Sequence, residues 1–204
     1  NAWSQSAKGE TSILIADLAD RSTIADIAAE AVRPFGAPDI LINAAGINTR
    51  QPADDMTDAH WDLTQNLNVA SPFFLAKAMV PGMRAKGWGR IINFASLQSR
   101  RAFANGISYG ASKGAVEQMT RAMAEAWSQD GITANAIAPG FFRTELTAPV
   151  FADPELSARN AAQTCIGRNG EVHDMDGPMM FFCSNASNYV TGQTLFVDGG
   201  YTAK

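Results

Sequence analysis

Short apolar runs alternate with longer helical patterns along this chain, and each run predicts a strand. The runs lie at residues 13–16, 39–42, 90–95, 132–137 and 194–197. Helical patterns cover about 22–32, 58–86 and 108–128, with one or two further helices expected within 143–188. Pro72 and Pro81 are expected to bend or break the helix over 58–86, because proline removes a backbone hydrogen bond. Strands this short and apolar are typical of a parallel sheet covered by helices on both faces.

The alternation of strands and helices predicts an α/β fold, a Rossmann-like doubly wound parallel sheet, in a single domain spanning residues 1–204. In such sheets, ligands bind outside the carboxyl ends of the strands. Polar or glycine-containing tails follow four of the apolar runs, at Asp17, 43–46, Ser96 and 139–140. We therefore expect these tails to converge on one crevice.

Composition narrows the class of protein. The chain has 204 residues, of which 46% are apolar and 18% charged, with a net charge of −4, as is ordinary for a globular protein. The sequence has no basic stripe, so we do not expect nucleic-acid binding. No apolar run approaches the ~20 residues that span a bilayer. Cys165 and Cys183 do not make a disulfide framework, and no secretory signal is visible, which favours the cytoplasm. His60 and His173 are too few to predict a metal site.

Two chemical motifs overlap in residues 108–114, which read S-Y-G-A-S-K-G. The first is G-x-S-x-G, which presents Ser112 as the nucleophile of a serine hydrolase only if a strand runs directly into it. The preceding residues contain Asn105 and Gly106, which indicate a loop, and no HGGG-type oxyanion sequence is present. We therefore favour Ser112 as a small residue at a helix packing surface. A hydrolase that uses Ser112, an Asp such as Asp153, and His173 is the less favoured alternative.

The second motif is Y-x-x-x-K, which places Tyr109 and Lys113 on one face of a helix. A nearby ammonium is expected to lower the pKa of the phenol, which otherwise lies near ~10. Such a phenol gives a proton to a ketone being reduced, or takes one from an alcohol being oxidised. Ser96, at the end of a predicted strand, offers a hydroxyl that could bind the substrate oxygen. Tyrosine and lysine are common on helix surfaces, so this motif alone is weak evidence.

Taken in order, a series of motifs resembles the short-chain dehydrogenase/reductase family from Asp17 to Gly200. The motifs are D-L at 17–18, N-A-A-G at 43–46, a helical Asn68, Ser96 with Y-x-x-x-K, P-G-x-x-x-T at 139–144 and V-D-G-G at 197–200. The stretches G-I-N-T-R, F-A-S-L-Q-S, A-P-G-F-F and I-G-R are most similar to the sugar-acid branch, which includes gluconate 5-dehydrogenases and deoxygluconate dehydrogenases.

The resemblance implies a role for each matching residue. Tyr109 is the expected general acid/base, Lys113 lowers its pKa and binds the nicotinamide ribose, and Ser96 holds the substrate oxygen. Asn68 completes the catalytic set by binding a water near Lys113. The implied cofactor is NAD or NADP, and its expected contacts are Asp17, Leu18, Asn43, Ala44, Ala45, Gly46, Tyr109, Lys113, Pro139, Gly140, Phe142 and Thr144.

The resemblance also implies a reaction, the interconversion of a secondary alcohol and a ketone by hydride transfer. The expected substrate is a sugar acid or polyol such as gluconate, and its candidate contacts are Ser96, Gln98, Arg50, Arg143 and Arg168. The alternatives are reduction of a 3-oxoacyl thioester by the same machinery, or a non-catalytic binding protein of the family. The resemblance further implies self-association as a homotetramer or dimer.

One departure from the family pattern lies at the N-terminus. Members begin with a strand and a turn of the type T-G-x-x-x-G-x-G, in which backbone approaches the pyrophosphate. Residues 1–12 hold a single glycine, so we expect the N-terminal βαβ portion to be missing from this chain. The preference between NAD and NADP is set in that portion and is not readable here.

Overall fold

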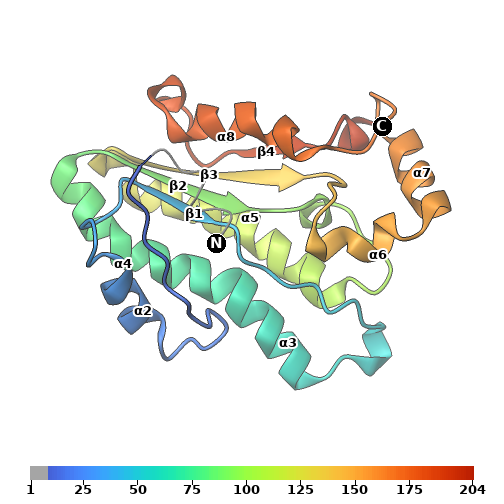
Figure 1. Ribbon diagram of the computed structural model, residues 1–204, viewed down its shortest axis with the longest axis horizontal. Coiled ribbons are helices and arrows are strands. Elements are labelled where there is room, and N and C mark those ends of the chain that lie inside the picture. Colours follow the sequence, from blue (N-terminus) through green and yellow to red (C-terminus); the bar gives the residue numbers. More distant parts are fainter. Residues whose placement is uncertain (1–8) are drawn as a thin grey trace.

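A four-stranded parallel sheet runs through the middle of the molecule in the computed structural model, which describes residues 9–204 (Figure 1). Its strands, in spatial as well as chain order, are β1 (Ile40–Asn43), β2 (Gly89–Phe94), β3 (Ile132–Pro139) and β4 (Thr194–Val197). All three pairings are parallel, and Asn43 lies opposite Asn93, which lies opposite Ala136. The carboxyl ends of the four strands therefore share one edge of the sheet.

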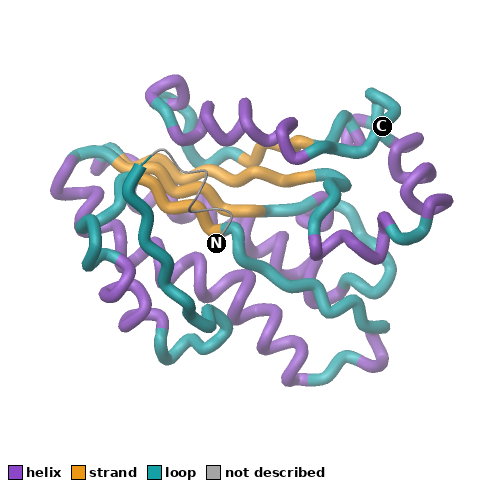
Figure 2. Tube along the Cα trace, viewed as in Figure 1, coloured by secondary structure: helices purple, strands orange, loops and turns teal. Residues whose placement is uncertain are grey.

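Helices cover both faces of this sheet (Figures 1 and 2). On one side lie α2 (Ile24–Ala31), α3 (Asp58–Gln65), α4 (Ser71–Lys86) and α5 (Ile107–Trp127), while α8 (Asp176–Cys183) lies on the other. The short α6 (Ala148–Phe151) and α7 (Pro154–Gln163) lie beyond the carboxyl ends of the strands. A π turn, η2 (Asn66–Ala70), joins α3 to α4. Short 3-10 turns are η1 (Ala53–Asp55), η3 (Leu97–Ser99), η4 (Ser128–Asp130), η5 (Glu145–Thr147), η6 (Val172–Met175), η7 (Asn185–Ser187) and η8 (Tyr201–Ala203).

Neighbouring residues of one strand supply the two sides of the core. Ile91 packs with Met83 and Met123 in the cluster beneath α4 and α5. Ile92 points the other way and packs with Phe182 of α8. This alternation follows from the two-residue period of a strand, and it explains why every residue of β2 is buried or half-buried, including the polar Arg90 and Asn93. The predicted doubly wound α/β fold is confirmed.

The predicted strands over 39–42, 90–95, 132–137 and 194–197 correspond to β1 to β4. The predicted strand over 13–16 is wrong, because this segment pairs with no strand among the described residues and Ile15 is 95% exposed. The predicted break at Pro81 is also wrong, because α4 continues through it with the buried Val80 and Met83 on either side. Instead, the helical segment changes its winding at η2, directly before Pro72, which lies in the first turn of α4.

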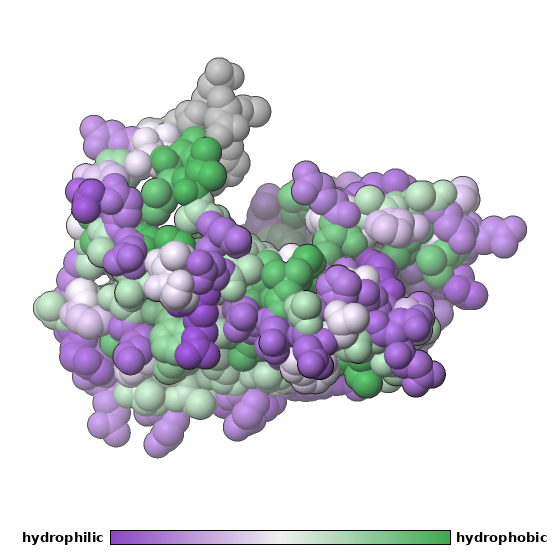
Figure 3. Space-filling view, turned by 90° about the horizontal axis from the view of Figure 1, so that it is seen from below, coloured by the Kyte–Doolittle hydropathy of each residue, from purple (hydrophilic) through white to green (hydrophobic). Residues whose placement is uncertain are grey.

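The face shown in Figure 3 is hollowed between two raised parts, and apolar residues gather in and around the hollow. Apolar side chains stay exposed along the N-terminal segment and on β1, at Ile13, Leu14, Ile15, Ile40 and Ile42. The β1 edge of the sheet is therefore less well covered than the other strands.

Two glycines with left-handed backbone give a matched test of the packing between α4 and β3. A Cβ on Gly131 (φ 80°) would lie 2.1 Å from the Gly87 carbonyl oxygen, whereas a Cβ on Gly87 (φ 63°) would meet open space. We expect Gly87→Ala to cost about 1 kcal/mol of unfolding free energy for the backbone conformation alone. Gly131→Ala adds the steric clash and is expected to cost about 3 kcal/mol. Equal losses in urea titrations of the two variants would contradict this packing.

Candidate active site

The predicted site residues meet at the carboxyl edge of the sheet. Asn43 ends β1, Ser96 follows β2 by two residues, and Gly140 follows β3. Gly140 comes close to the segment after β4, because a Cβ on it would lie 2.8 Å from the Asp198 Cα. Four strand ends therefore form one wall, and α5 carries Tyr109 and Lys113 to it.

Tyr109 and Lys113 lie one turn apart near the start of α5, and both are buried, at 7% and 5% exposure. The Lys113 Nζ lies 5.6 Å from the centre of the Tyr109 ring. It donates a hydrogen bond of 2.6 Å to the Phe94 carbonyl oxygen, at the end of β2. The predicted pairing of the two side chains on one helix face is therefore present, and it faces the sheet.

Burial dominates the pKa of both groups. It lowers the pKa of Lys113 to about 8. It raises the pKa of Tyr109 above its usual value, although the Ser96 hydroxyl and the Arg50 guanidinium act in the opposite direction. The pKa of Tyr109 is thus not lowered overall as the sequence led us to expect, because desolvation outweighs the lowering by Ser96 and Arg50, and the Lys113 ammonium is hydrogen-bonded to Phe94. Both Ser96 and Arg50 stand near enough to the Tyr109 hydroxyl to influence its charge.

Ser96 begins the loop that leads from β2 to α5. Its hydroxyl accepts a hydrogen bond of 3.1 Å from the backbone N–H of Gln98. The Ser99 hydroxyl accepts one from the backbone N–H of Ser96, which completes a capping box. The Ser99 hydroxyl also donates to the Lys113 carbonyl oxygen at 2.8 Å. The sequence analysis missed this role of Ser99, although the S-x-x-S spacing of a capping box was available as a signal.

Asn68 lies in the π turn η2, buried at 1% exposure. Its amide bonds both the backbone N–H and the carbonyl of Ile47 at 2.9 Å, and it donates to the Ser112 hydroxyl at 2.9 Å. A Cβ on Gly46 would lie 3.3 Å from Asn68 Oδ1 and 3.6 Å from Lys113 Nζ. The loop after β1, the π turn and α5 therefore converge on the Lys113 ammonium, and Gly46 leaves it room.

Ser112 has no access to a substrate, since it is fully buried inside α5. Its hydroxyl donates to the Tyr109 carbonyl oxygen at 2.7 Å and accepts the hydrogen bond from Asn68. A helix, not a strand, runs into it, so the nucleophile-elbow interpretation of G-x-S-x-G loses its structural support.

The predicted cofactor residues are spread along the same edge. Asn43 donates to Asn93 Oδ1 at 2.9 Å and so ties β1 to β2, while the Asp17 carboxylate accepts from the Ala19 amide at 2.9 Å. The Leu18 carbonyl accepts a hydrogen bond from the Ser71 hydroxyl. Ala44, Ala45 and Gly46 form the loop leaving β1, while Pro139 ends β3 and Gly140 follows it.

Two of these residues use their side chains elsewhere. The Phe142 ring packs on Gly170, where an added Cβ would lie 2.6 Å from it, and Thr144 caps η5 through Thr147.

The donor set around Lys113 fits the ribose of a dinucleotide. An ammonium has three N–H donors, and Lys113 gives one of them to Phe94. The other two have no partner among residues 9–204 of the chain, although the group is buried. A pair of vicinal ribose hydroxyls would satisfy both donors, which a buried charge requires.

The structure separates the three candidate arginines. Arg50 adopts a left-handed backbone (φ 51°) and donates from Nη2 to the Leu146 carbonyl oxygen at 2.8 Å, so it spans from the loop after β1 to η5. Arg143 stacks on the Phe151 ring, with its Cζ 4.6 Å from the ring centre. Arg168 forms a bidentate pair with Asp174 at 2.7 and 2.9 Å. Of the three, only Arg50 lowers the pKa of Tyr109.

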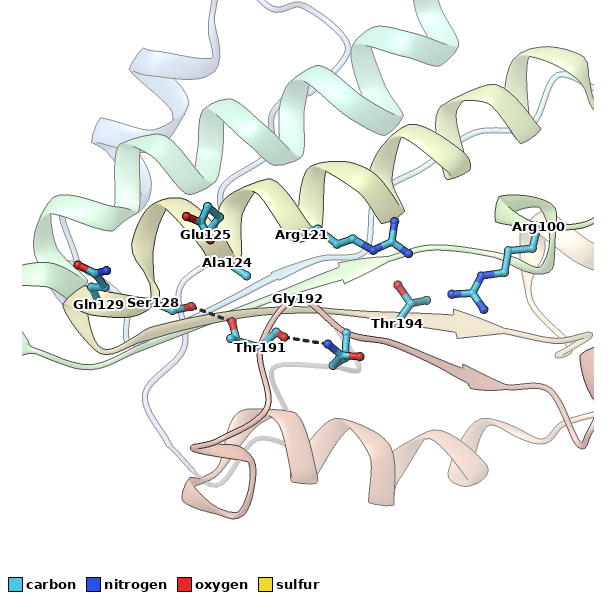
Figure 4. A pocket seen from close by; sticks show the side chains of 10 residues that line it. Arg100, Arg121, Ala124, Glu125, Ser128, Gln129, Thr191, Gly192 and Thr194 are labelled. Carbon is cyan, nitrogen blue, oxygen red and sulfur yellow. Dashed lines mark hydrogen bonds between the residues drawn. The ribbon is translucent and has the colours of Figure 1, made fainter.

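Two cavities of about 480 and 500 Å³ lie outside this wall. The first lies between α5 and the segment before β4, where Ser128 and Thr191 are hydrogen-bonded (Figure 4). None of the predicted site residues lines it. The second is lined by Gln98, by Phe103 and by the start of α5 at 106–110, so it borders the loop after Ser96.

Within residues 9–204, no helix is long and apolar enough to cross a membrane. The same part of the chain brings together no group of three or more His, Cys, Asp or Glu that could hold a metal ion.

Comparisons with known proteins match this chain to dehydrogenases and reductases. The family model for enoyl-(acyl carrier protein) reductase matches residues 2–202. Gluconate 5-dehydrogenase of Gluconobacter oxydans is 38% identical over 193 residues, which are 95% of this chain and 75% of that relative. The 2-dehydro-3-deoxy-D-gluconate 5-dehydrogenase of Escherichia coli is 41% identical over 192 residues, covering 94% and 76%.

A solved structure gives the same result. The crystal structure of a gluconate 5-dehydrogenase from Burkholderia cenocepacia, in complex with NADP and tartrate, has a TM-score of 0.88 and 39% identity. The match covers 93% of this chain and 74% of that one.

The lowered pKa of Lys113 makes a testable prediction about stability. Between pH 8 and 10 the unfolded chain keeps the lysine proton that the folded chain has lost, so the free energy of unfolding rises with pH. From pH 7.5 to 9.5 this rise amounts to about 2 kcal/mol. Lys113→Met should lack it. Urea unfolding of both proteins at the two pH values measures the difference, and parallel pH profiles would contradict the burial of this charge.

Proposed function

Because the chain belongs to the short-chain dehydrogenase/reductase family, we propose that it interconverts a secondary alcohol and a ketone with NAD or NADP, acting on a sugar acid or polyol such as gluconate. The observation that carries the proposal is the convergence of Tyr109, Lys113, Ser96 and Asn68 at one edge of the sheet. We propose these four as the catalytic set, in one dinucleotide-binding and catalytic domain spanning residues 1–204.

The residues of the chain handle the proton. A bound nicotinamide supplies or accepts the hydride at the carbon that changes oxidation state. In reduction, Tyr109 donates its phenolic proton to the carbonyl oxygen, and its raised pKa keeps that proton in place at neutral pH. In oxidation, Tyr109 takes the proton of the alcohol, and the nearby Arg50 cation favours the phenolate. Ser96 holds the reacting oxygen, while Lys113 binds the ribose and Asn68 fixes the loop beside it.

We propose Arg50 as the partner of the substrate carboxylate. Its guanidinium is at the Tyr109 side of the site, and the hydrogen bond to Leu146 leaves other N–H donors for a carboxylate. Arg168 is already paired with Asp174, and Arg143 stacks on Phe151. Ser96 and Gln98, at the turn after β2, complete the proposed substrate contacts.

For the remaining cofactor contacts we propose Asp17 and Leu18 for the adenine. Residues 43–46 lie along the ribose, and Pro139, Gly140, Phe142 and Thr144 line the nicotinamide. We further propose that the protein is cytoplasmic and self-associates as a homotetramer or dimer. Apolar side chains that remain exposed on α4 and α8, such as Phe73, Met180 and Phe181, support a partner surface.

Tyr109→Phe tests the mechanism. The variant lacks only the hydroxyl, so we expect turnover of gluconate to fall about a thousandfold. The Kd of the dinucleotide should stay within about twofold, because the ring that packs near Lys113 is kept. Reduced nicotinamide absorbance gives the rate, and calorimetry gives the Kd. Tyr189→Phe, at a fully exposed tyrosine, is the matched control, and full activity of Tyr109→Phe would exclude this role.

Arg50→Gln tests the substrate class. Loss of a charged partner should raise the KM for gluconate about tenfold or more, since a charge-assisted hydrogen bond contributes about 1.5–3 kcal/mol. The KM for the neutral polyol glucitol should change much less. The variant should also shift the alkaline rise of oxidation to higher pH, because the phenolate loses a nearby cation. Arg168→Gln serves as control.

Equal KM changes for the acid and the polyol would contradict a carboxylate contact at Arg50. Turnover of 3-oxoacyl thioesters with none of gluconate would overturn the sugar-acid proposal in favour of thioester reduction.

A further inference from the structure

Three aromatic rings from distant parts of the chain meet beside the site. Phe103 belongs to the loop 97–106, which follows Ser96, Phe141 follows β3, and Tyr201 lies in η8 at the end of the chain. The ring centres are 6.1 Å apart for Phe103 and Phe141, 6.3 Å for Phe103 and Tyr201, and 5.7 Å for Phe141 and Tyr201. Each distance lies in the range of attractive aromatic pairs.

Tyr201 is held firmly at the centre of this aromatic cluster. It is 5% exposed, and the segment around it is anchored by the Asp198 carboxylate, which accepts from the Gly200 and Thr202 amides at 2.9 Å. The Gly199 carbonyl accepts from the Cys165 amide at 2.8 Å. The Tyr201 hydroxyl has no hydrogen-bond partner within residues 9–204, so the ring itself makes the contacts.

The C-terminal tail, residues 198–204, is also joined to α7. Lys204 Nζ donates to the carbonyl oxygens of Ala162 and Thr164, at 3.3 and 2.9 Å. Figure 1 shows the C-terminus beside α7, at the carboxyl edge of the sheet. The end of the chain therefore contacts the region 143–170 on one side and loop 97–106 on the other.

Loop 97–106 depends on the tail for much of its support. Arg101 places its guanidinium 5.7 Å from the Tyr201 ring centre, so a second residue of the loop contacts the same ring. Arg100, next to it, is instead paired with Glu117 of α5 at 2.6 Å. The half of the loop near Ser96 is thus fixed by α5, whereas the half containing Arg101 and Phe103 is fixed by Tyr201.

We propose that Tyr201 is a positioning residue that sets the separation between loop 97–106 and the segment after Gly140, and that it thereby determines substrate selectivity. This inference rests on the proposed function, because these two segments carry Gln98 and the proposed nicotinamide contacts. Tyr201 itself touches neither the reacting atoms nor the Tyr109 hydroxyl. Its loss should weaken substrate binding and leave the proton chemistry intact.

Hydrogen–deuterium exchange tests the positioning without any substrate. Tyr201→Ala should speed exchange in peptides from 97–106 and 139–147, while Tyr201→Phe, which keeps the ring, should match the wild type. Tyr189→Ala, at a fully exposed tyrosine in another part of the chain, is the matched control. Phe103→Leu is a milder change in the same cluster and should give the same pattern if Tyr201→Ala folds poorly. Unchanged exchange in Tyr201→Ala and Phe103→Leu would overturn the proposal.

Steady-state kinetics test the selectivity. Tyr201→Ala should raise the KM for gluconate about tenfold, because a loosened loop 97–106 must be ordered again when the substrate binds. The kcat should stay within about twofold, and Tyr201→Phe should keep the wild-type KM. An equal fall in kcat, or a KM that does not move, would overturn the assigned role. If the wild type turns over no sugar acid, the proposed function fails, whereas the exchange data still decide whether Tyr201 holds the two segments.

Discussion

A buried ammonium joins helix α5 to the central strands, and the geometry of the site depends on it. Lys113 is almost completely removed from water, and among residues 9–204 only the Phe94 carbonyl satisfies one of its donors. An ammonium in this position is costly unless its remaining donors are paired. Ser99 binds the backbone of the same residue. Side chain and backbone of Lys113 thus fix where α5 begins relative to the end of β2.

Small residues make this arrangement possible. An added Cβ at Gly110 or Gly114 would meet the carbonyl oxygens of Gln98 and Ser99 at 3.6 and 3.8 Å, so α5 lies directly on the turn after Ser96. On the next face of the helix, Ser112 links the Tyr109 carbonyl to Asn68. The same seven residues that offer Tyr109 and Lys113 to the site therefore also provide the close packing that orients them.

Most of the fold could be predicted from the sequence, because apolar runs of four to eight residues between long helical patterns are specific for a parallel sheet. The segment 13–16 shows the limit of this approach, since it has the composition of a strand but pairs with no strand in the part of the chain that the structure describes. The grouping of Tyr109, Lys113, Ser96 and Asn68 was predictable because the ordered motifs that contain them resemble those of the short-chain dehydrogenase/reductase family.

The sequence could not predict the pKa shifts of the site residues or the partners of the arginines. The pKa of Tyr109 depends on burial and on Arg50, which is 59 residues away in sequence. The choice among the three arginines was equally inaccessible, because stacking on Phe151 and pairing with Asp174 arise only when the chain is folded.

The π turn at 66–70 has a consequence for how this helix tolerates changes in length. A π turn closes its hydrogen bonds over one residue more than an α-helical turn does. Deleting one residue within it would put α3 and α4 in a single α-helical register, with Pro72 inside the merged helix. The same deletion would rotate everything on one side by about 100°. Asn68 could then no longer meet both Ile47 and Ser112. The one extra residue that the π turn contains therefore sets the direction in which the buried Asn68 amide points.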